Sequence, residues 1–205
     1  MMVVEPDTQH FMICVTEPLI DVSACDIVSS HLPASGLRIK EERRSQTMQM
    51  SEHGLELLKQ WEGFKNKLYN DSAGLPTIGV GHLLTKSELS SGQIVINGAP
   101  VQYDGGLSDQ QVLDLLKQDM TPAAQLVTNK VTVQLNQNQF DALTSFTFNV
   151  GGGAFNGSTL LKLLNQGQYD QVPTQLRRWN KAGGKVVQGL VNRRENEIKL
   201  WNGLV

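Results

Sequence analysis

The sequence predicts an α+β protein, in which a helix and a small β-hairpin lobe are joined to a larger, all-helical lobe. Apolar residues at three- and four-residue steps predict a helix after Ser51, and turn formers around short β-branched pieces predict strands over 70–82. From Ser108 onward, capping residues and helical periodicity continue as far as Trp201. Strands that are segregated from most of the helices are typical of the α+β class.

The first predicted helix begins at Ser51, a residue type that favours the N-cap position. Its apolar residues share one helical face: Leu55, Leu58, Trp61, Phe64 and Leu68. The segment that follows, over 70–82, is rich in turn-forming residues and predicts a small hairpin or a three-stranded sheet. A second polar, glycine-rich stretch over 90–106 predicts another hairpin.

The helices of the second lobe are marked by capping residues and by proline at a first helical position. The predicted starts, in chain order, are Ser108 with Gln111, Thr121 with Pro122, Asn136 with Gln139, and Ser158. Glycines over 151–153 are expected to end the third of these helices. Two further helical stretches lie on either side of the glycine pair within 182–184.

Composition excludes several classes of protein. The chain has 205 residues, of which 40% are hydrophobic and 19% charged, as in ordinary globular proteins. The formal net charge of −2 differs from the strong positive charge typical of nucleic-acid-binding proteins. No stretch approaches the roughly 20 apolar residues that a membrane-spanning helix needs. Residues 121–205 are basic, with nine Lys and Arg against four Asp and Glu, which suits either an anionic polymer or a solvated helical face.

Residues 1–50 show no sustained periodicity and predict an N-terminal extension, poorly ordered or of unknown role, ahead of a body over 51–205. Both cysteines, Cys14 and Cys25, lie in this extension, so the body needs no disulfide framework. The first basic residue is Arg38, and a secretory signal would need an earlier one. We therefore expect synthesis in the cytoplasm without a signal peptide.

The residues that carry chemistry are concentrated in 57–85. Glu62 lies near the end of the first helical run, Asp71 lies in the following turn, and Thr77 opens the next strand. A helix end that turns into a hairpin can bring the second carboxylate and the hydroxyl back beside the first carboxylate. One protonated carboxyl, one ionised carboxylate and a held water can cleave a glycosidic bond. The alternative is that these three residues only cap turns at the surface.

The same stretch resembles the phage-type lysozymes, or endolysins, of glycoside hydrolase family 24, which include the lysozymes of T-even phages. The family motif is Glu-Gly, then Tyr-x-Asp, then Thr-Ile-Gly-x-Gly-His, and here it reads Glu62-Gly63, Tyr69-Asn70-Asp71 and Thr77-Ile78-Gly79-Val80-Gly81-His82. Further similar blocks lie at 140–151, 158–161, 179–184 and 189–201. The resemblance covers about 51–205, excludes 1–50, and implies a lysozyme-like fold for the two lobes.

The resemblance implies that Glu62 is the general acid, that Asp71 is the second catalytic carboxylate, and that Thr77 helps to position the water. It implies hydrolysis of the β-1,4 bond between N-acetylmuramic acid and N-acetylglucosamine in bacterial peptidoglycan, and the threonine-held water suggests inversion. Beside Trp61, Glu62 is expected to be partly desolvated, whereas Asp71 in a polar turn should stay ionised. No cofactor and no metal are implied.

Two other functions remain open. A lytic transglycosylase would use a single acid and close an anhydro ring without water, and the presence of Asp71 and Thr77 argues against it. A non-catalytic wall-binding module would need none of the three residues. The resemblance further implies a monomer that binds peptidoglycan glycan strands and that reaches the wall through a holin-type membrane lesion or an injection system.

Several other polar residues have structural interpretations. His82, after two glycines, is expected to form hydrogen bonds or an ion pair. The arginine pairs Arg177-Arg178 and Arg193-Arg194 either face the polymer or form ion pairs with acidic neighbours such as Glu197.

Overall fold

The computed structural model describes residues 48–71 and 73–205, so nearly all of the predicted extension over 1–50 lies outside the described residues. The elements in chain order are α2 (Glu52–Glu62), β1 (Lys65–Asn70), β2 (Pro76–Gly79), β3 (His82–Leu83), α3 (Lys86–Ser91), β4 (Gln93–Ile96), β5 (Ala99–Gln102), α4 (Asp109–Lys130), α5 (Gln137–Val150), α6 (Gly152–Asn156), α7 (Thr159–Asn165), the 3₁₀ turn η1 (Tyr169–Gln171), α8 (Val172–Arg177), β6 (Lys181–Ala182), β7 (Lys185–Val186) and α9 (Gln188–Trp201). This order confirms the predicted α+β architecture.

The small lobe contains two separate antiparallel sheets. Strands β1, β2 and β3 pair in that order, and β4 pairs with β5. The second hairpin turns at Asn97 and Gly98, whose φ angles of +52° and +78° match the residue types that favour such tight turns. Both predicted sheets are therefore present. The helix α3 between them was not predicted, although Thr85 and Glu88 form its capping box.

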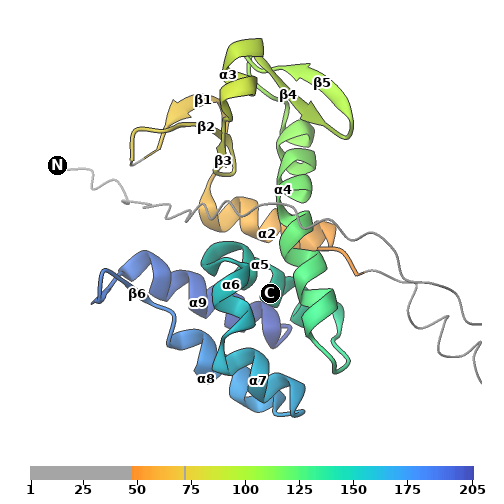
Figure 1. Ribbon diagram of the computed structural model, residues 1–205, viewed down its shortest axis with the longest axis vertical. Helices are drawn as coiled ribbons and strands as arrows, with labels where there is room; N and C mark the ends of the chain where they lie inside the picture. Colours follow the sequence, from red (N-terminus) through yellow and green to blue (C-terminus); the bar gives the residue numbers. More distant parts are fainter. Residues whose placement is uncertain (1–47, 72) are drawn as a thin grey trace, which may run out of the picture.

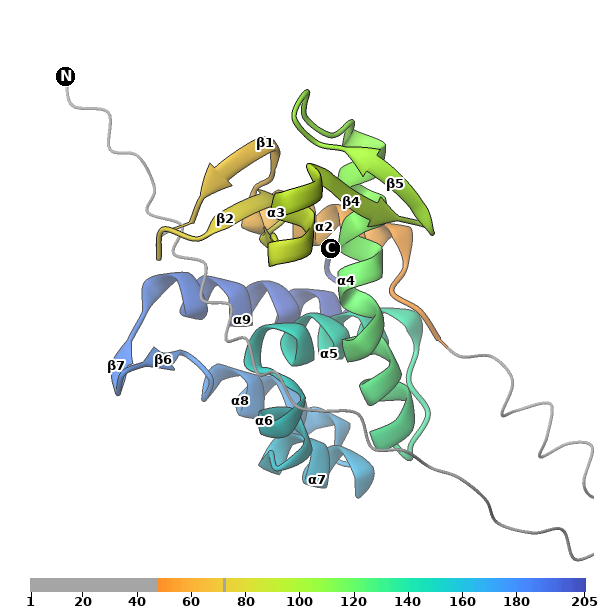
Figure 2. The same ribbon diagram turned by 45° about the horizontal axis from the view of Figure 1, so that its top comes forward.

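The long helix α4 joins the two lobes, running from the β4–β5 hairpin into the helical lobe (Figures 1 and 2). The prediction that Pro122 opens a new helix is wrong, because α4 continues through it. An interior proline costs about 3 kcal/mol through its missing N–H and its ring. The buried face of α4 continues on both sides, at Met120, Ala123, Ala124 and Val127, so packing offsets this cost while Pro122 itself faces solvent.

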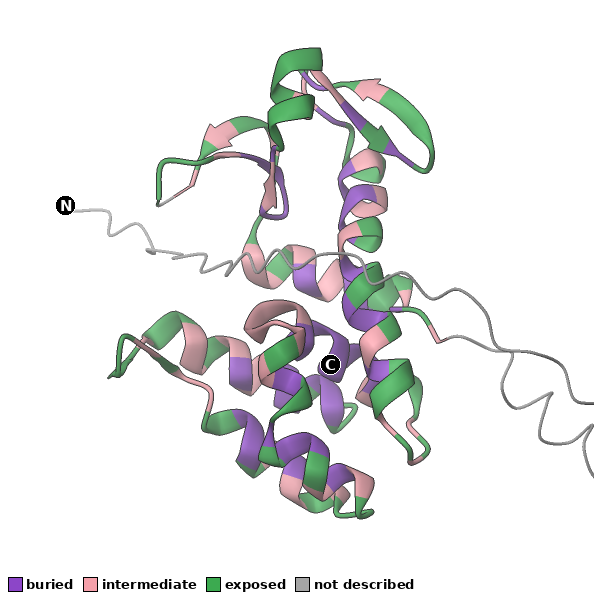
Figure 3. Ribbon diagram, viewed as in Figure 1, coloured by how far each residue is buried: buried purple, intermediate pink, exposed green. Residues whose placement is uncertain are grey.

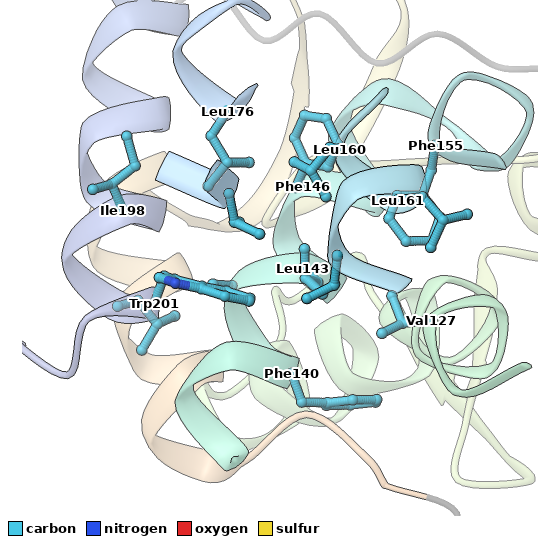
Figure 4. Packing of buried hydrophobic residues seen from close by; sticks show 14 of the residues in the cluster. Val127, Phe140, Leu143, Phe146, Phe155, Leu160, Leu161, Leu176, Ile198 and Trp201 are labelled. Atoms are coloured by element: carbon cyan, nitrogen blue, oxygen red, sulfur yellow. The ribbon is translucent and has the colours of Figure 1, made fainter. Parts of the chain in front are cut away.

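Each lobe has its own apolar core, and α2 lies between them. Buried residues follow the inner faces of the helices in both lobes (Figure 3). In the helical lobe, Phe146 of α5 packs edge-on against Phe155 and Trp179, with ring centroids 6.4 Å and 5.5 Å apart; Figure 4 shows Phe146 and Phe155 with the surrounding leucines. Trp61, near the end of α2, packs against both cores and so fixes this helix end relative to both lobes.

The first helix is shorter than its apolar spacing predicts. The helix ends at Glu62 because Gly63 adopts φ +69°, a conformation that favours glycine. The prediction that Phe64 and Leu68 continue the buried helical face is therefore wrong; they are 37% and 47% exposed. The predicted N-cap Ser51 is confirmed, and its side chain accepts a hydrogen bond from the Gly54 backbone.

A buried carboxylate anchors the start of α2 to the helical lobe. Asp141 of α5 accepts hydrogen bonds from the backbone N–H and the hydroxyl of Ser51, and from Gln137 Nε2 at 2.8 Å. Burial raises the pKa of Asp141, against the lowering effect of these hydrogen bonds. Gly54 is required here, because a Cβ atom would lie 2.8 Å from Asp141 Oδ2. The N-terminal end of α2 is thus fixed on α5.

Candidate active site

Glu62 is the last residue of α2, which ends beneath the three-stranded sheet and above α9 (Figures 1 and 2). Its side chain is 13% exposed, and its Oε1 lies 2.8 Å from Nη1 of Arg193 on α9. Glu62 is thus largely shielded from water, as its position beside Trp61 predicts. A carboxyl held at the junction of the two lobes can meet a polymer that lies against both.

Asp71 and Thr77 lie together on the β1–β2 hairpin. Asp71 follows β1, and its Oδ1 accepts hydrogen bonds from the backbone N–H groups of Ala73 and Leu75, both at 2.8 Å. Thr77 faces Tyr69 in the register of the two strands, and its hydroxyl donates to the Leu75 carbonyl at 2.9 Å. The turn therefore places a carboxylate and a hydroxyl at the same end of the hairpin.

Both groups keep capacity for a further partner. Among the residues that the structure describes, those of the turn donate to Oδ1 of Asp71 and not to Oδ2. The donating Thr77 hydroxyl retains oxygen lone pairs that can accept a hydrogen bond. Burial raises the pKa of Tyr69, and the negative charge of nearby Asp71 raises it further. A carboxylate next to a hydroxyl acceptor is suited to holding and activating a water molecule.

The contact between Glu62 and Arg193 was missed, since nothing in the local pattern links α2 to α9. The sequence left two alternatives for the arginine pairs, which were contact with a polymer and ion pairing with acidic neighbours. The structure favours ion pairing for Arg177 and Arg194. Arg194 lies 2.9 Å from Glu197, and Arg177 lies 2.7 Å from Glu195. Arg194 is thus part of the buried core, whereas Arg177 is paired at the surface.

His82 forms the ion pair expected of a structural histidine. Its Nδ1 lies 2.9 Å from Oδ2 of Asp119, and its Nε2 lies 3.5 Å from Oε1 of Glu88. Burial lowers the pKa of His82, but the hydrogen bond and charge of Asp119, together with Glu88, outweigh burial and raise the pKa overall. His82 therefore joins the three-stranded sheet to α4 and α3 and stands outside the proposed chemistry.

We predict that His82→Asn lowers the free energy of unfolding by about 1.5–3 kcal/mol at pH 5.5, since it removes a charged hydrogen-bond partner. Because the folded-state pKa lies above the unfolded value of about 6.5, this contribution is complete below that value and is lost as pH rises through the folded pKa. Urea unfolding at a series of pH values measures it. The exposed His53, changed in the same way, is the control, and a His82 effect equal at pH 5.5 and pH 9.5 would contradict the ion pair.

Residues 48–71 and 73–205 contain no group of three or more His, Cys, Asp or Glu residues that could hold a metal ion. No helix within the same ranges is long and apolar enough to cross a membrane.

Comparisons with known proteins identify similar sequences among phage proteins. The phage lysozyme sequence profile matches residues 59–197. The endolysin of Salmonella phage P22 is 39% identical over 154 residues, which cover 75% of this chain and 98% of that protein. The endolysin of Bacillus phage PZA is 40% identical over 160 residues, or 76% of this chain and 55% of that protein. The chain thus spans about half the length of the PZA relative.

A solved structure extends the likeness to three dimensions. The crystal structure of a P22 lysozyme mutant superposes with a TM-score of 0.63 at 37% identity, covering 76% of this chain and 99% of that one. Fold, motif spacing and sequence similarity therefore agree, and the chain belongs to the phage lysozyme family.

Proposed function

We propose that the chain is a lysozyme that hydrolyses the β-1,4 bond between N-acetylmuramic acid and N-acetylglucosamine in bacterial peptidoglycan. The observation that carries the proposal is the position of Glu62: a mostly buried carboxyl at a helix end between the lobes, close in sequence to the Asp71–Thr77 turn. Family membership supports the same activity.

Each group has a defined role in this proposal. Glu62 donates a proton to the leaving glycosidic oxygen. The Asp71 carboxylate lies opposite the cation-like sugar that forms as the bond breaks, and it accepts the proton that the attacking water loses. Thr77 accepts a hydrogen bond from the water and orients it beside Asp71. An acid and a base in different environments, one shielded and one in a polar turn, are what this reaction needs.

The water held by Asp71 and Thr77 implies inversion at the anomeric carbon, since water attacks from the face opposite the leaving group. The first sugar product should then be the α-anomer. Proton NMR during the first minutes of cleavage of a soluble glycan-chain fragment distinguishes it from the β-anomer, which a retaining enzyme would release.

The test of the activity itself is the release of new reducing ends from purified peptidoglycan. Borohydride reduction followed by sugar analysis should find reduced N-acetylmuramic acid at the new ends. Reduced N-acetylglucosamine would mean that the other glycosidic bond is cut. Binding to the wall with no new ends and no soluble fragments would favour the wall-binding module.

We predict that a protein starting at Met48 folds and lyses permeabilised cells as well as the full chain. The regular sequence pattern begins only after this point, and the packed body already includes residues 48–50. Met48 packs against the core of the helical lobe, Met50 is buried in the other core, and Gln137 Nε2 donates to the Gln49 carbonyl at 2.9 Å. A start at Met50 should therefore melt at a lower temperature than a start at Met48.

Thermal melting and turbidity assays on both truncated proteins measure this prediction. An insoluble Met48 protein, or one that melts many degrees below the full chain, would show that residues 1–47 stabilise the body. Markedly higher activity after truncation would identify residues 1–47 as an inhibitory arm.

We also propose that the protein acts on the host cell wall as a monomer, after release or delivery by a holin-type lesion or an injection system. Membership of the phage lysozyme family supports a role in host lysis. Lysis that requires permeabilised cells in the purified system would agree with dependence on such a route.

A further inference from the structure

A buried cluster of charged side chains extends from α9 to the end of α2. Its members are Glu62, Arg193, Arg194 and Glu197, and the side chains of Arg194 and Glu197 are only 1% and 0% exposed. Taking such charges out of water costs several kcal/mol each, so every member depends on partners inside the cluster. The proposed catalytic acid is one of those partners.

Glu197 is the centre of the cluster. Its Oε1 accepts hydrogen bonds from Ser145 Oγ at 2.9 Å and from Arg194 Nη2 at 3.0 Å, and it lies 3.5 Å from Arg193 Nε. Its Oε2 lies 2.9 Å from Arg194 Nε. Both oxygens of this carboxylate therefore face guanidinium groups.

Arg193 links the buried carboxylate to the proposed acid. One edge of its guanidinium faces Glu197, while Nη1 lies 2.8 Å from Glu62 Oε1. The Arg193 side chain is 13% exposed, so solvent screens these contacts weakly. A change of charge at Glu197 therefore changes the electrostatic potential at Glu62.

Glu197 supplies the charge that balances the second arginine. From α9 it faces Arg193 and Arg194, and from α2 the charge of Glu62 acts on it. From α5 the cluster meets neutral groups: Ser145, the Asn149 oxygen at 2.8 Å from Arg194 Nη2, and the Phe146 ring at 5.0 Å from the Arg194 guanidinium. From α8, Arg177 is paired at the surface with Glu195. Without Glu197, two cations would face Glu62 alone.

We propose that Glu197 is a positioning residue for the acid step: it holds Arg193 against Glu62 and offsets the positive charge that Arg194 brings to the same cluster. This inference rests on the proposed role of Glu62 as the general acid. Burial raises the pKa of Glu197 against the opposing charges of Arg194 and Arg193, in keeping with a strongly desolvated member of one coupled group. The role of Glu197 is electrostatic, and it acts without touching substrate.

The test is the pH dependence of kcat/KM on purified peptidoglycan, with the full chain. The alkaline limb of this profile reports loss of the proton from the acid in the free enzyme. In Glu197→Gln the limb should move to lower pH by about one unit, as expected when a charge within several ångströms is removed. The control is Glu195→Gln, an equal charge change on the same helix at an exposed surface pair, which should leave the limb in place.

A second comparison keeps the test independent of the stability of Glu197→Gln. The double variant Arg193→Gln with Glu197→Gln loses one charge of each sign and so leaves the cluster balanced. The alkaline limb of the double variant should lie at lower pH than that of Arg193→Gln alone, because Glu197 still offsets the charge of Arg194 in the single variant. The inference would be overturned if the limb lay at the same pH in Glu197→Gln and wild type, and also in the double variant and Arg193→Gln. That result would leave the acid role of Glu62 intact. Wild-type turnover in Glu62→Gln would instead overturn the acid assignment and this inference with it.

Discussion

Glu62→Gln is expected to lower the turnover of peptidoglycan by about 10²–10⁴-fold, the range typical for loss of a general acid. The amide cannot donate a proton of the required acidity to the leaving oxygen, but it keeps the shape of the side chain. Its carbonyl oxygen can still accept a hydrogen bond from Arg193 Nη1, so folding and wall binding should change little. Rates of reducing-end release and pull-down on intact walls measure the two effects separately.

The matched control for this prediction is Glu56→Gln. Glu56 lies on the same helix, but its side chain is 46% exposed and its nearest ionic partner is Lys59 at 3.9 Å. The same chemical change should leave turnover within about twofold of wild type, since exposed pairs of this kind contribute little. If Glu62→Gln kept more than about a tenth of wild-type turnover, the range for general acids would rule out the acid role.

Asp71→Asn should be nearly as damaging, with a loss of about 10²-fold or more for removal of the ionised partner. In this structure the substitution removes the charge of the side chain and keeps its hydrogen-bond acceptor. Asn retains an Oδ1 atom that can accept from the Ala73 and Leu75 backbone N–H groups, so the turn stays formed while the charge is lost. The expected result is therefore a loss of kcat with an unchanged melting temperature.

Asp104→Asn is the control for this second prediction, because Asp104 is an exposed carboxylate of the same lobe. Asp71→Ala, which also removes the turn acceptor, should lower both activity and stability. Normal activity in Asp71→Asn would remove the need for a second carboxylate and would favour the lytic transglycosylase, which uses a single acid.

The fold could be predicted where the signals are local. The caps at Ser51, Ser108, Asn136 and Ser158 are each confirmed, because a capping side chain bonds to a backbone group three residues away and needs no distant partner. The prediction failed where packing decides. Pro122 is tolerated because both flanking turns of α4 bury apolar residues, and a proline signal read without that context predicts a break.

The first helix shows a different kind of failure. Phe64 and Leu68 continue the spacing of Leu55, Leu58 and Trp61 by coincidence, and the chain has already turned at Gly63. The glycine was visible in the sequence, and its weight as a helix terminator exceeds that of two further apolar residues. A glycine that follows a helical run should therefore be taken as the end of the helix, even where the apolar spacing continues beyond it.

The residues of the candidate site also fall into two groups, those that a local motif identifies and those that only the packing brings together. Glu62, Asp71 and Thr77 lie within one short stretch, so a local sequence motif is enough to identify them as candidates. Arg193 and Glu197 join the site only through the packing of α9 against α2 and α5, which no local pattern encodes. The surrounding charges of a site are thus harder to predict than its reactive groups.

Hydrolysis is tested most directly by mass spectrometry of the fragments released from purified peptidoglycan in ¹⁸O-labelled water. A hydrolase places one oxygen from water on C1 of the new reducing end, so the released fragments should have N-acetylmuramic acid ends that carry ¹⁸O. Their initial rate of formation should fall by about 10²–10⁴-fold when Glu62→Gln replaces the wild-type protein. Unlabelled 1,6-anhydro ends would contradict hydrolysis and establish the transglycosylase, and intact glycan strands would contradict catalysis altogether.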